Sequence, residues 1–103
     1  MTMLRELLMI NGNINDFIDK ITYGDEVIFT YQGKKFFIQG YRENDVDGKC
    51  ILYLSQLEPP VDGYFGVYKG GERLYPVNEF LNASIWNGKT FMDIEKNVEW
   101  VDE

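Results

Sequence analysis

A chain of 103 residues has the length of one small domain, and its 16% aromatic content separates it from disordered chains, which cannot bury a core. The 17 acidic residues against 10 basic ones give a formal net charge of -7, which repels phosphate backbones and disfavours nucleic-acid binding. The sequence contains no histidine and one cysteine, Cys50, which excludes an internal disulfide and removes the commonest general base and metal ligand.

The N-terminal segment is apolar as far as Ile10 but is interrupted by Arg5 and Glu6. Its apolar run is too short for a secretory signal or a membrane span, and no basic segment precedes it. We therefore expect a cytoplasmic protein that does not associate with membranes. Codons for Arg5 and Glu6 can form a purine-rich ribosome-binding site shortly before Met9. This supports the hypothesis that Met9 is the natural start and that residues 1–8 are an upstream extension.

The first predicted element is a helix from Ile14 to about Tyr23. Asn13 is a suitable N-cap, and Gly24 can adopt the left-handed conformation that ends many helices. Apolar residues at spacings of three and four share one helical face, so the helix must pack this stripe against another element. The stripe consists of Ile14, Phe17, Ile18 and Ile21.

A β-hairpin is predicted next, with strands over 26–31 and 34–39 joined by Gln32-Gly33. Glycine tolerates the positive φ that a two-residue hairpin turn requires. Ile28 and Phe37 make one side of the hairpin partly apolar, so that a later element or a partner can cover it. Two apolar pairs share the other side, which we expect the helix to cover: Phe29 with Phe36, and Val27 with Ile38.

The middle of the chain is predicted to hold a third strand and a second hairpin. The third strand covers residues 50–54. Residues 55–63 are excluded from a central strand because they contain two prolines, which cannot donate a ladder hydrogen bond. The second hairpin pairs residues 64–68 with 73–75 around a pair of glycines.

Two helices are predicted in the C-terminal part. The first is short, covers residues 77–83 and turns Phe80 and Leu81 inward. The second follows the N-cap Thr90, and the acidic stretch 93–103 is either its solvated face with a frayed tail or an electrostatic docking patch. The inward face of this second helix is expected to consist of Phe91, Ile94 and Val98.

The order of these elements predicts the fold class. Strands come in one run between helices, which is typical of α+β proteins with an antiparallel sheet. We expect a single α+β domain over residues 1–103, with a sheet of about four to five strands, an N-terminal helix and one or two C-terminal helices.

Two segments of the chain, residues 24–38 and 79–95, resemble small uncharacterised cytosolic proteins of Gram-positive, gut-type bacteria. In those proteins a short N-terminal helix precedes a hairpin bearing Tyr-x-Gly-Lys-Lys, and a Gly-Lys segment precedes the last helix. The resemblance covers both ends of the domain and leaves residues 42–75 unmatched. It implies a bacterial cytosolic origin and brings no activity with it.

The residues that usually carry chemistry are mostly missing from the sequence. Without histidine there is no Ser-His or Cys-His nucleophile pair, and one cysteine cannot build a zinc site in the usual way. Cys50 heads an apolar strand and is expected to be a core thiol rather than a nucleophile. We therefore expect no catalytic residue, no cofactor and no metal site.

One segment, residues 58–68, combines acids, prolines and aromatics in a pattern that suits a protein-binding surface. The alternative is that its aromatic residues complete the core. The candidate surface residues are Glu58, Asp62, Tyr64, Phe65 and Tyr68.

Protein binding is the function that remains by elimination. The acidic charge favours a basic protein partner, for example a nuclease toxin neutralised in the manner of immunity and antitoxin proteins. One alternative is an enzyme or small-ligand binder that uses carboxylates and tyrosines. Another is a self-associating structural protein that forms a homodimer through Ile28 and Phe37. No nucleic-acid partner is expected.

Overall fold

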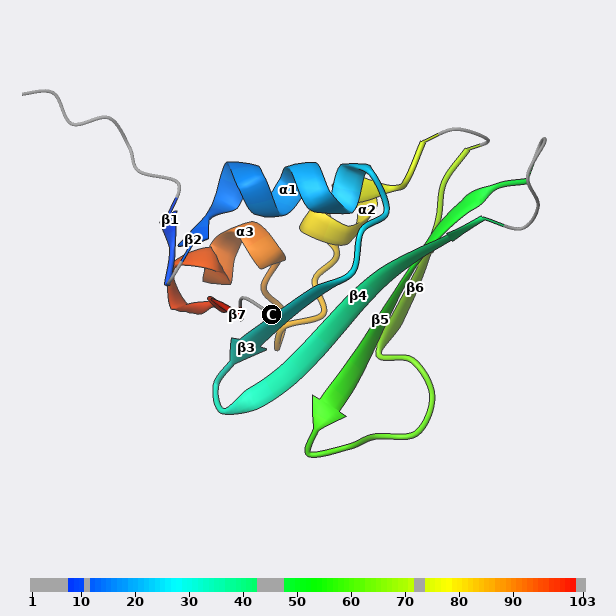
Figure 1. The fold of residues 1–103 in the computed structure, drawn as a ribbon. Helices are drawn as coiled ribbons and strands as arrows, with labels where there is room; N and C mark the ends of the chain where they lie inside the picture. Colours follow the sequence, from blue (N-terminus) through cyan, green and yellow to red (C-terminus); the bar gives the residue numbers. More distant parts are fainter. Residues whose placement is uncertain (1–7, 11, 43–47, 72–73, 102–103) are drawn as a thin grey trace, which may run out of the picture.

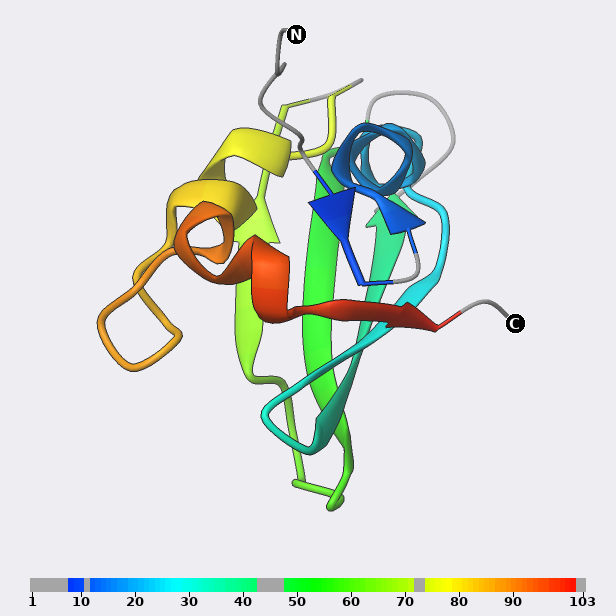
Figure 2. The ribbon, with the colours of Figure 1, turned by 90° about the vertical axis from the view of Figure 1, so that its left-hand side faces the viewer.

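The computed structural model describes residues 8–10, 12–42, 48–71 and 74–101, and Figure 1 shows how they are arranged. Within them, five strands form an antiparallel sheet in the order β6-β5-β4-β3-β7, and the helices lie on one side of it (Figures 1 and 2). This confirms the predicted α+β class. The elements are β1 (Leu8–Met9), β2 (Gly12–Asn13), α1 (Ile14–Thr22), β3 (Val27–Tyr31), β4 (Lys34–Arg42), β5 (Cys50–Glu58), β6 (Gly66–Lys69), α2 (Val77–Asn82), α3 (Phe91–Ile94), the 3-10 turn η1 (Glu95–Asn97) and β7 (Glu99–Val101).

Helix α1 begins and ends where the sequence predicts. The side chain of Asn13 accepts a hydrogen bond from the backbone N–H of Asn15 at 2.7 Å, which caps the first turn. Gly24 has a φ of 75°, the left-handed conformation that lets the chain leave the helix. The predicted stripe is confirmed on its inner side, since Ile14, Phe17 and Ile21 are fully buried.

The first hairpin also has the predicted register. Gln32 and Gly33 both have positive φ, 53° and 78°, as a two-residue turn that matches strand twist requires. Phe29 is opposite Phe36, and their rings stack with centroids 5.4 Å apart beneath the helices. Side chains alternate along these strands, so Ile28 and its partner residue point to the other side of the sheet.

Strand β5 is longer than predicted. It continues through Ser55 to Glu58, whereas the sequence predicts that it ends at Leu54. The prolines that motivated the shorter strand follow it directly. Strand β6 leaves β5 at Leu54, so Ser55, Gln56 and Glu58 pair with β4 alone and form the edge of the sheet, where a following proline is tolerated.

The predicted second hairpin is wrong. Strand β6 does form, but it pairs with β5 and not with Leu74 or Tyr75. Leu74 and Tyr75 belong to no strand, and residue 73 lies outside the described residues. The ring of Tyr75 lies tightly against Gly40 of β4 and Gly24 after α1, so this segment packs between the sheet and the end of the helix without joining a strand.

The C-terminal part contains one element that the sequence does not predict, a final strand. Thr90 and Asp93 form the expected cap reciprocally: the backbone N–H of Thr90 donates to Asp93 Oδ2 at 2.9 Å, and the backbone N–H of Asp93 donates to Thr90 Oγ1 at 3.2 Å. The helix lasts one turn, however, and Glu99–Val101 pair with β3 as strand β7. The expectation of a solvated helix face is therefore wrong for these three residues, because the free edge of β3 takes them into the sheet.

The short N-terminal pair β1-β2 joins the C-terminal strand. The backbone N–H of Ile10 donates to Val98 O at 2.9 Å, and that of Trp100 donates to Ile10 O at 3.0 Å. Met9 is buried in the core, while residues 1–7 of the hypothetical extension lie outside the described residues. The first and last described segments of the chain are thus bonded to each other beside β3.

Aromatic rings fill the space between the sheet and the helices. Phe17 of α1 stacks on Phe91 of α3 with centroids 5.1 Å apart, and Phe29 of the sheet meets both rings edge-on. Phe80 and Trp86, from the segment between β6 and α3, complete this cluster and are almost fully buried. No helix among the described residues is long and apolar enough to cross a membrane.

Candidate functional site

The side of the sheet that faces away from the helices carries apolar and aromatic side chains that are not fully buried. Alternation along each strand buries one set of side chains under the helices and leaves the other set pointing out. No described helix lies over this outer set (Figure 1). We call this surface the open face; its apolar and aromatic members, half-buried or exposed, are Ile28, Phe37, Tyr41, Tyr53, Val67 and Val101.

Three tyrosines form a row across the open face. Tyr41 of β4 is a diagonal neighbour of Tyr53 on β5, and their ring centroids are 6.3 Å apart. Tyr64, in the loop before β6, packs on Tyr53 with centroids 4.5 Å apart. Tyr41 and Tyr64 are 53% and 56% exposed, so the row presents ring surface and hydroxyl groups to solvent while Tyr53 anchors it to the sheet. We call these residues the tyrosine row.

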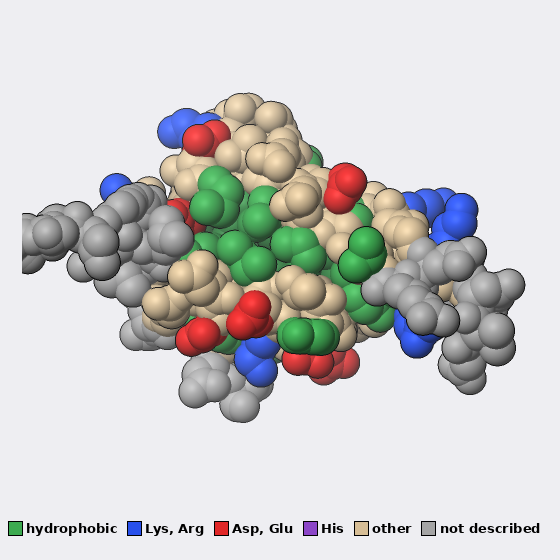
Figure 3. All heavy atoms as spheres, turned by 90° about the horizontal axis from the view of Figure 1, so that it is seen from above, with side chains coloured by type: hydrophobic (Ala, Val, Ile, Leu, Met, Phe, Trp, Pro, Cys, Tyr) green, Lys and Arg blue, Asp and Glu red, His purple; other side chains and the backbone are tan. Residues whose placement is uncertain are grey.

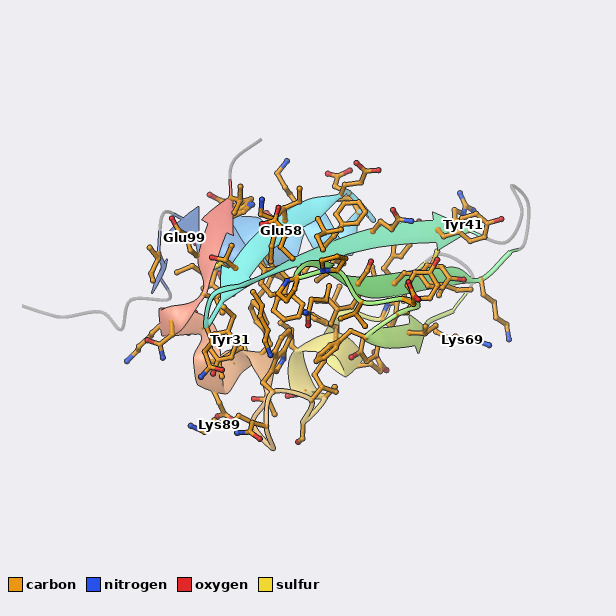
Figure 4. All side chains as sticks on the ribbon, turned by 90° about the horizontal axis from the view of Figure 1, so that it is seen from below. Tyr31, Tyr41, Glu58, Lys69, Lys89 and Glu99 are labelled. Carbon is orange, nitrogen blue, oxygen red and sulfur yellow. The ribbon has the colours of Figure 1, made fainter. Side chains whose placement is uncertain are left out.

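Charged side chains of both signs lie along the sheet on this side of the molecule. Lys35 Nζ is 3.4 Å from Glu58 Oε2, an exposed ion pair that joins β4 to the end of β5. Figure 4 views the molecule from below and places Tyr41 and Lys69 at one end of the sheet, with Glu99 toward the other. The described surface has nearly as many basic as acidic residues. Much of the excess negative charge belongs to residues that the structure does not describe, among them Glu43, Asp45, Asp47, Asp102 and Glu103.

The five candidate residues from the sequence do not form one surface. Tyr64 lies in the tyrosine row, and Glu58 lies on the same face through its pair with Lys35. Asp62 is exposed in the loop between β5 and β6. The remaining two, Phe65 and Tyr68, point elsewhere.

Phe65 and Tyr68 contact the helix side of the sheet. The ring of Phe65 lies 5.5 Å from those of Phe36 and Trp86, so it covers the core although it stays 40% exposed. Tyr68 packs edge-on against Phe80 at 5.9 Å, and burial raises the pKa of its phenol. For these two residues the geometry matches the alternative in which the aromatics complete the core.

Sequence reasoning missed Tyr41 and Tyr53, the other two members of the row. They come from different strands and meet only because β4 and β5 pair with Gly40 opposite Leu52. A local signal did exist, since Tyr53 alternates with buried leucines along β5. Its neighbour could not be identified without the register between the strands.

The hollows of the described surface offer little for carboxylate chemistry. Three of them, with volumes of about 250, 500 and 350 Å³, are each lined by at most one described carboxylate, Glu26 in the first and Glu79 in the second. Among the described residues, no group of three or more Cys, Asp or Glu side chains could hold a metal ion. No family model, curated protein or solved structure matches the chain.

Proposed function

We propose that this chain is a non-catalytic protein-binding module and that the open face is its binding surface. The observation that carries the proposal is the tyrosine row, which stands exposed on a sheet face that no described helix covers. Tyrosine is enriched at protein interfaces because a rigid ring supplies a large contact area and the hydroxyl group can bond to a polar partner. The hydrogen-bonded sheet carries Tyr41 and Tyr53, and Tyr64 packs on Tyr53 from the loop before β6.

A basic protein is the partner that best suits this surface. Arginine and lysine side chains are attracted to the faces of tyrosine rings within about 6 Å. The net charge of -7 would also speed the encounter with a positively charged protein. An immunity or antitoxin protein that neutralises a basic toxin would need both properties.

The two alternatives have less support. An enzyme built on carboxylates needs at least two of them around one hollow, and none of the three hollows described above has that arrangement. Self-association through Ile28 and Phe37 would use the same open face, but both side chains are already half-buried by their neighbours in the single chain.

The test is affinity capture with a variant of the row. Tyr41→Ser combined with Tyr64→Ser removes the two exposed rings and leaves the fold intact, because neither residue is buried. Tyr23→Ser is the matched control, since Tyr23 is 76% exposed at the end of α1. We expect a basic protein that the wild type and the control capture and the double variant does not.

Two outcomes would overturn the proposal. One is that the double variant captures the same proteins as the wild type. The other is that light scattering finds a wild-type dimer that the double variant loses, which would assign the open face to self-association.

A further inference from the structure

A groove runs over the helix side of the molecule, on the opposite side of the sheet from the open face. It lies between α1 and the segment that leads from β6 into α2, and it has a volume of about 500 Å³. Ile18 and Thr22 line it from α1, and Leu74, Val77 and Glu79 line it from the other bank. Such a volume is large enough for several side chains of a partner.

The groove is apolar although it is open to solvent. Leu74 is 71% exposed, and Ile18 and Val77 are each partly exposed at the edge of the core. Figure 3 shows a strip of hydrophobic side chains across this side of the molecule. Exposed apolar surface bordered by polar groups marks interaction sites, because water contact with it is unfavourable.

Acidic side chains stand on both banks of the groove. Glu79 is the one charged residue among its described lining residues. On α1, Asp19 is adjacent to Ile18 and three residues before Thr22, so helical spacing places it on the same bank and toward solvent. Figure 3 shows acidic side chains on both sides of the hydrophobic strip. A partner that binds here must therefore be apolar where it enters the groove. Basic side chains on either side of that apolar part would strengthen its binding.

We propose that this groove binds an amphipathic helix of a partner protein, with an apolar stripe and a basic polar side. Its apolar residues, at spacings of three and four, would fill the space between Ile18 and Val77. Its lysine or arginine residues would lie beside Asp19 and Glu79. This site is separate from the open face, so the two surfaces can be occupied independently.

The experiment titrates the isotope-labelled protein with a synthetic peptide of leucine and lysine at helical spacing. A peptide in which glutamate replaces every lysine is the control, because it keeps the same apolar stripe and reverses the charge. We expect the leucine/lysine peptide to shift the NMR signals of residues around Ile18, Thr22 and Val77. The glutamate peptide should produce no such shifts.

Variants then separate groove binding from general attraction to an acidic protein. Leu74→Ser should weaken binding of the leucine/lysine peptide about fivefold, because it removes an exposed apolar contact. Glu79→Gln should weaken it about twofold at low salt, whereas the equally acidic Asp62→Asn, in the loop between β5 and β6, should have no effect. Tyr41→Ser with Tyr64→Ser should bind the peptide as the wild type does.

The proposal is overturned if the two peptides bind equally or if the shifts spread over the whole surface. It is also overturned if they concentrate on the open face. The proposal is likewise overturned if Leu74→Ser binds the leucine/lysine peptide as tightly as the wild type does while its circular dichroism spectrum shows that it is folded. Loss of peptide binding in the double tyrosine variant would show that the open face, and not the groove, holds the peptide.

Discussion

Replacing Tyr68 by phenylalanine should stabilise the protein. The hydroxyl of Tyr68 is buried and has no hydrogen-bond partner among the described residues, whereas water satisfies it in the unfolded chain. Leaving a buried polar group unpaired costs about 1–3 kcal/mol. The Tyr68→Phe variant keeps the ring on Phe80, so we expect a gain of about 1 kcal/mol, or roughly 4–8 °C in Tm for a domain of this size.

The same variant should change how stability depends on alkaline pH. Burial raises the pKa of Tyr68 in the folded state, while an unfolded tyrosine ionises near pH 10. Below about pH 10 the phenol is neutral in both states, and its ionisation does not change the free energy of unfolding. As pH rises from there toward the folded pKa, the unfolded state ionises first and the free energy of unfolding falls. Tyr68→Phe should flatten this decline in part. Burial also raises the pKa of Tyr75, which remains in the variant.

Urea unfolding followed by circular dichroism, at pH 7 and above pH 10, measures both effects. Tyr41→Phe is the matched control, because its hydroxyl is on an exposed side chain and its removal should change the free energy of unfolding by less than about 0.5 kcal/mol. If Tyr68→Phe instead lost 1 kcal/mol or more, the hydroxyl would have a partner and the argument would be wrong.

Three further predictions concern the fold, and urea unfolding measures each. Phe91→Ala should lose about 3–5 kcal/mol, because it removes a fully buried ring from the centre of the aromatic cluster; a loss below 1 kcal/mol would contradict that central position. Thr90→Ala should lose about 1 kcal/mol by removing the cap of α3. The backbone N–H and then the side chain of Thr90 lower the pKa of Asp93, a contribution that is lost as pH falls through that pKa; alanine removes only the side-chain part, so the variant should lose slightly less stability in acid than the wild type. Gly40→Ala should lose about 1–3 kcal/mol, because the added carbon would lie 2.6 Å from the backbone that follows α1, whereas Gly71→Ala meets open space and should change little.

The parts of the fold that the sequence predicts are those fixed by neighbouring residues. The cap at Asn13, the Gln32-Gly33 turn and the reciprocal bonds of Thr90 with Asp93 each need contacts within a few residues. The alternation of apolar residues then sets the register of the hairpin that the turn joins. These elements form as predicted because local geometry and burial favour the same arrangement.

The pairing of distant strands could not be predicted in the same way. Strand β6 pairs with β5, and β7 pairs with β3. The residues within β6 and β7 do not indicate which strand will be the partner. The candidate site depends on another pairing of strands, that of β4 with β5, since Tyr41 and Tyr53 meet across these two strands. Tyr64 and Phe65 are adjacent in sequence, yet one contacts the open face and the other the core.

The bonds between Ile10 and β7 have a consequence for the order of folding. The last described strand fills the edge of β3 and also holds the first described segment through Val98 and Trp100. While this strand is still inside the ribosome, the nascent chain lacks one edge of its sheet and the residues that hold its N-terminal segment. Cooperative folding should therefore wait until β7 has left the ribosome, with the hairpin of β3 and β4 formed beforehand.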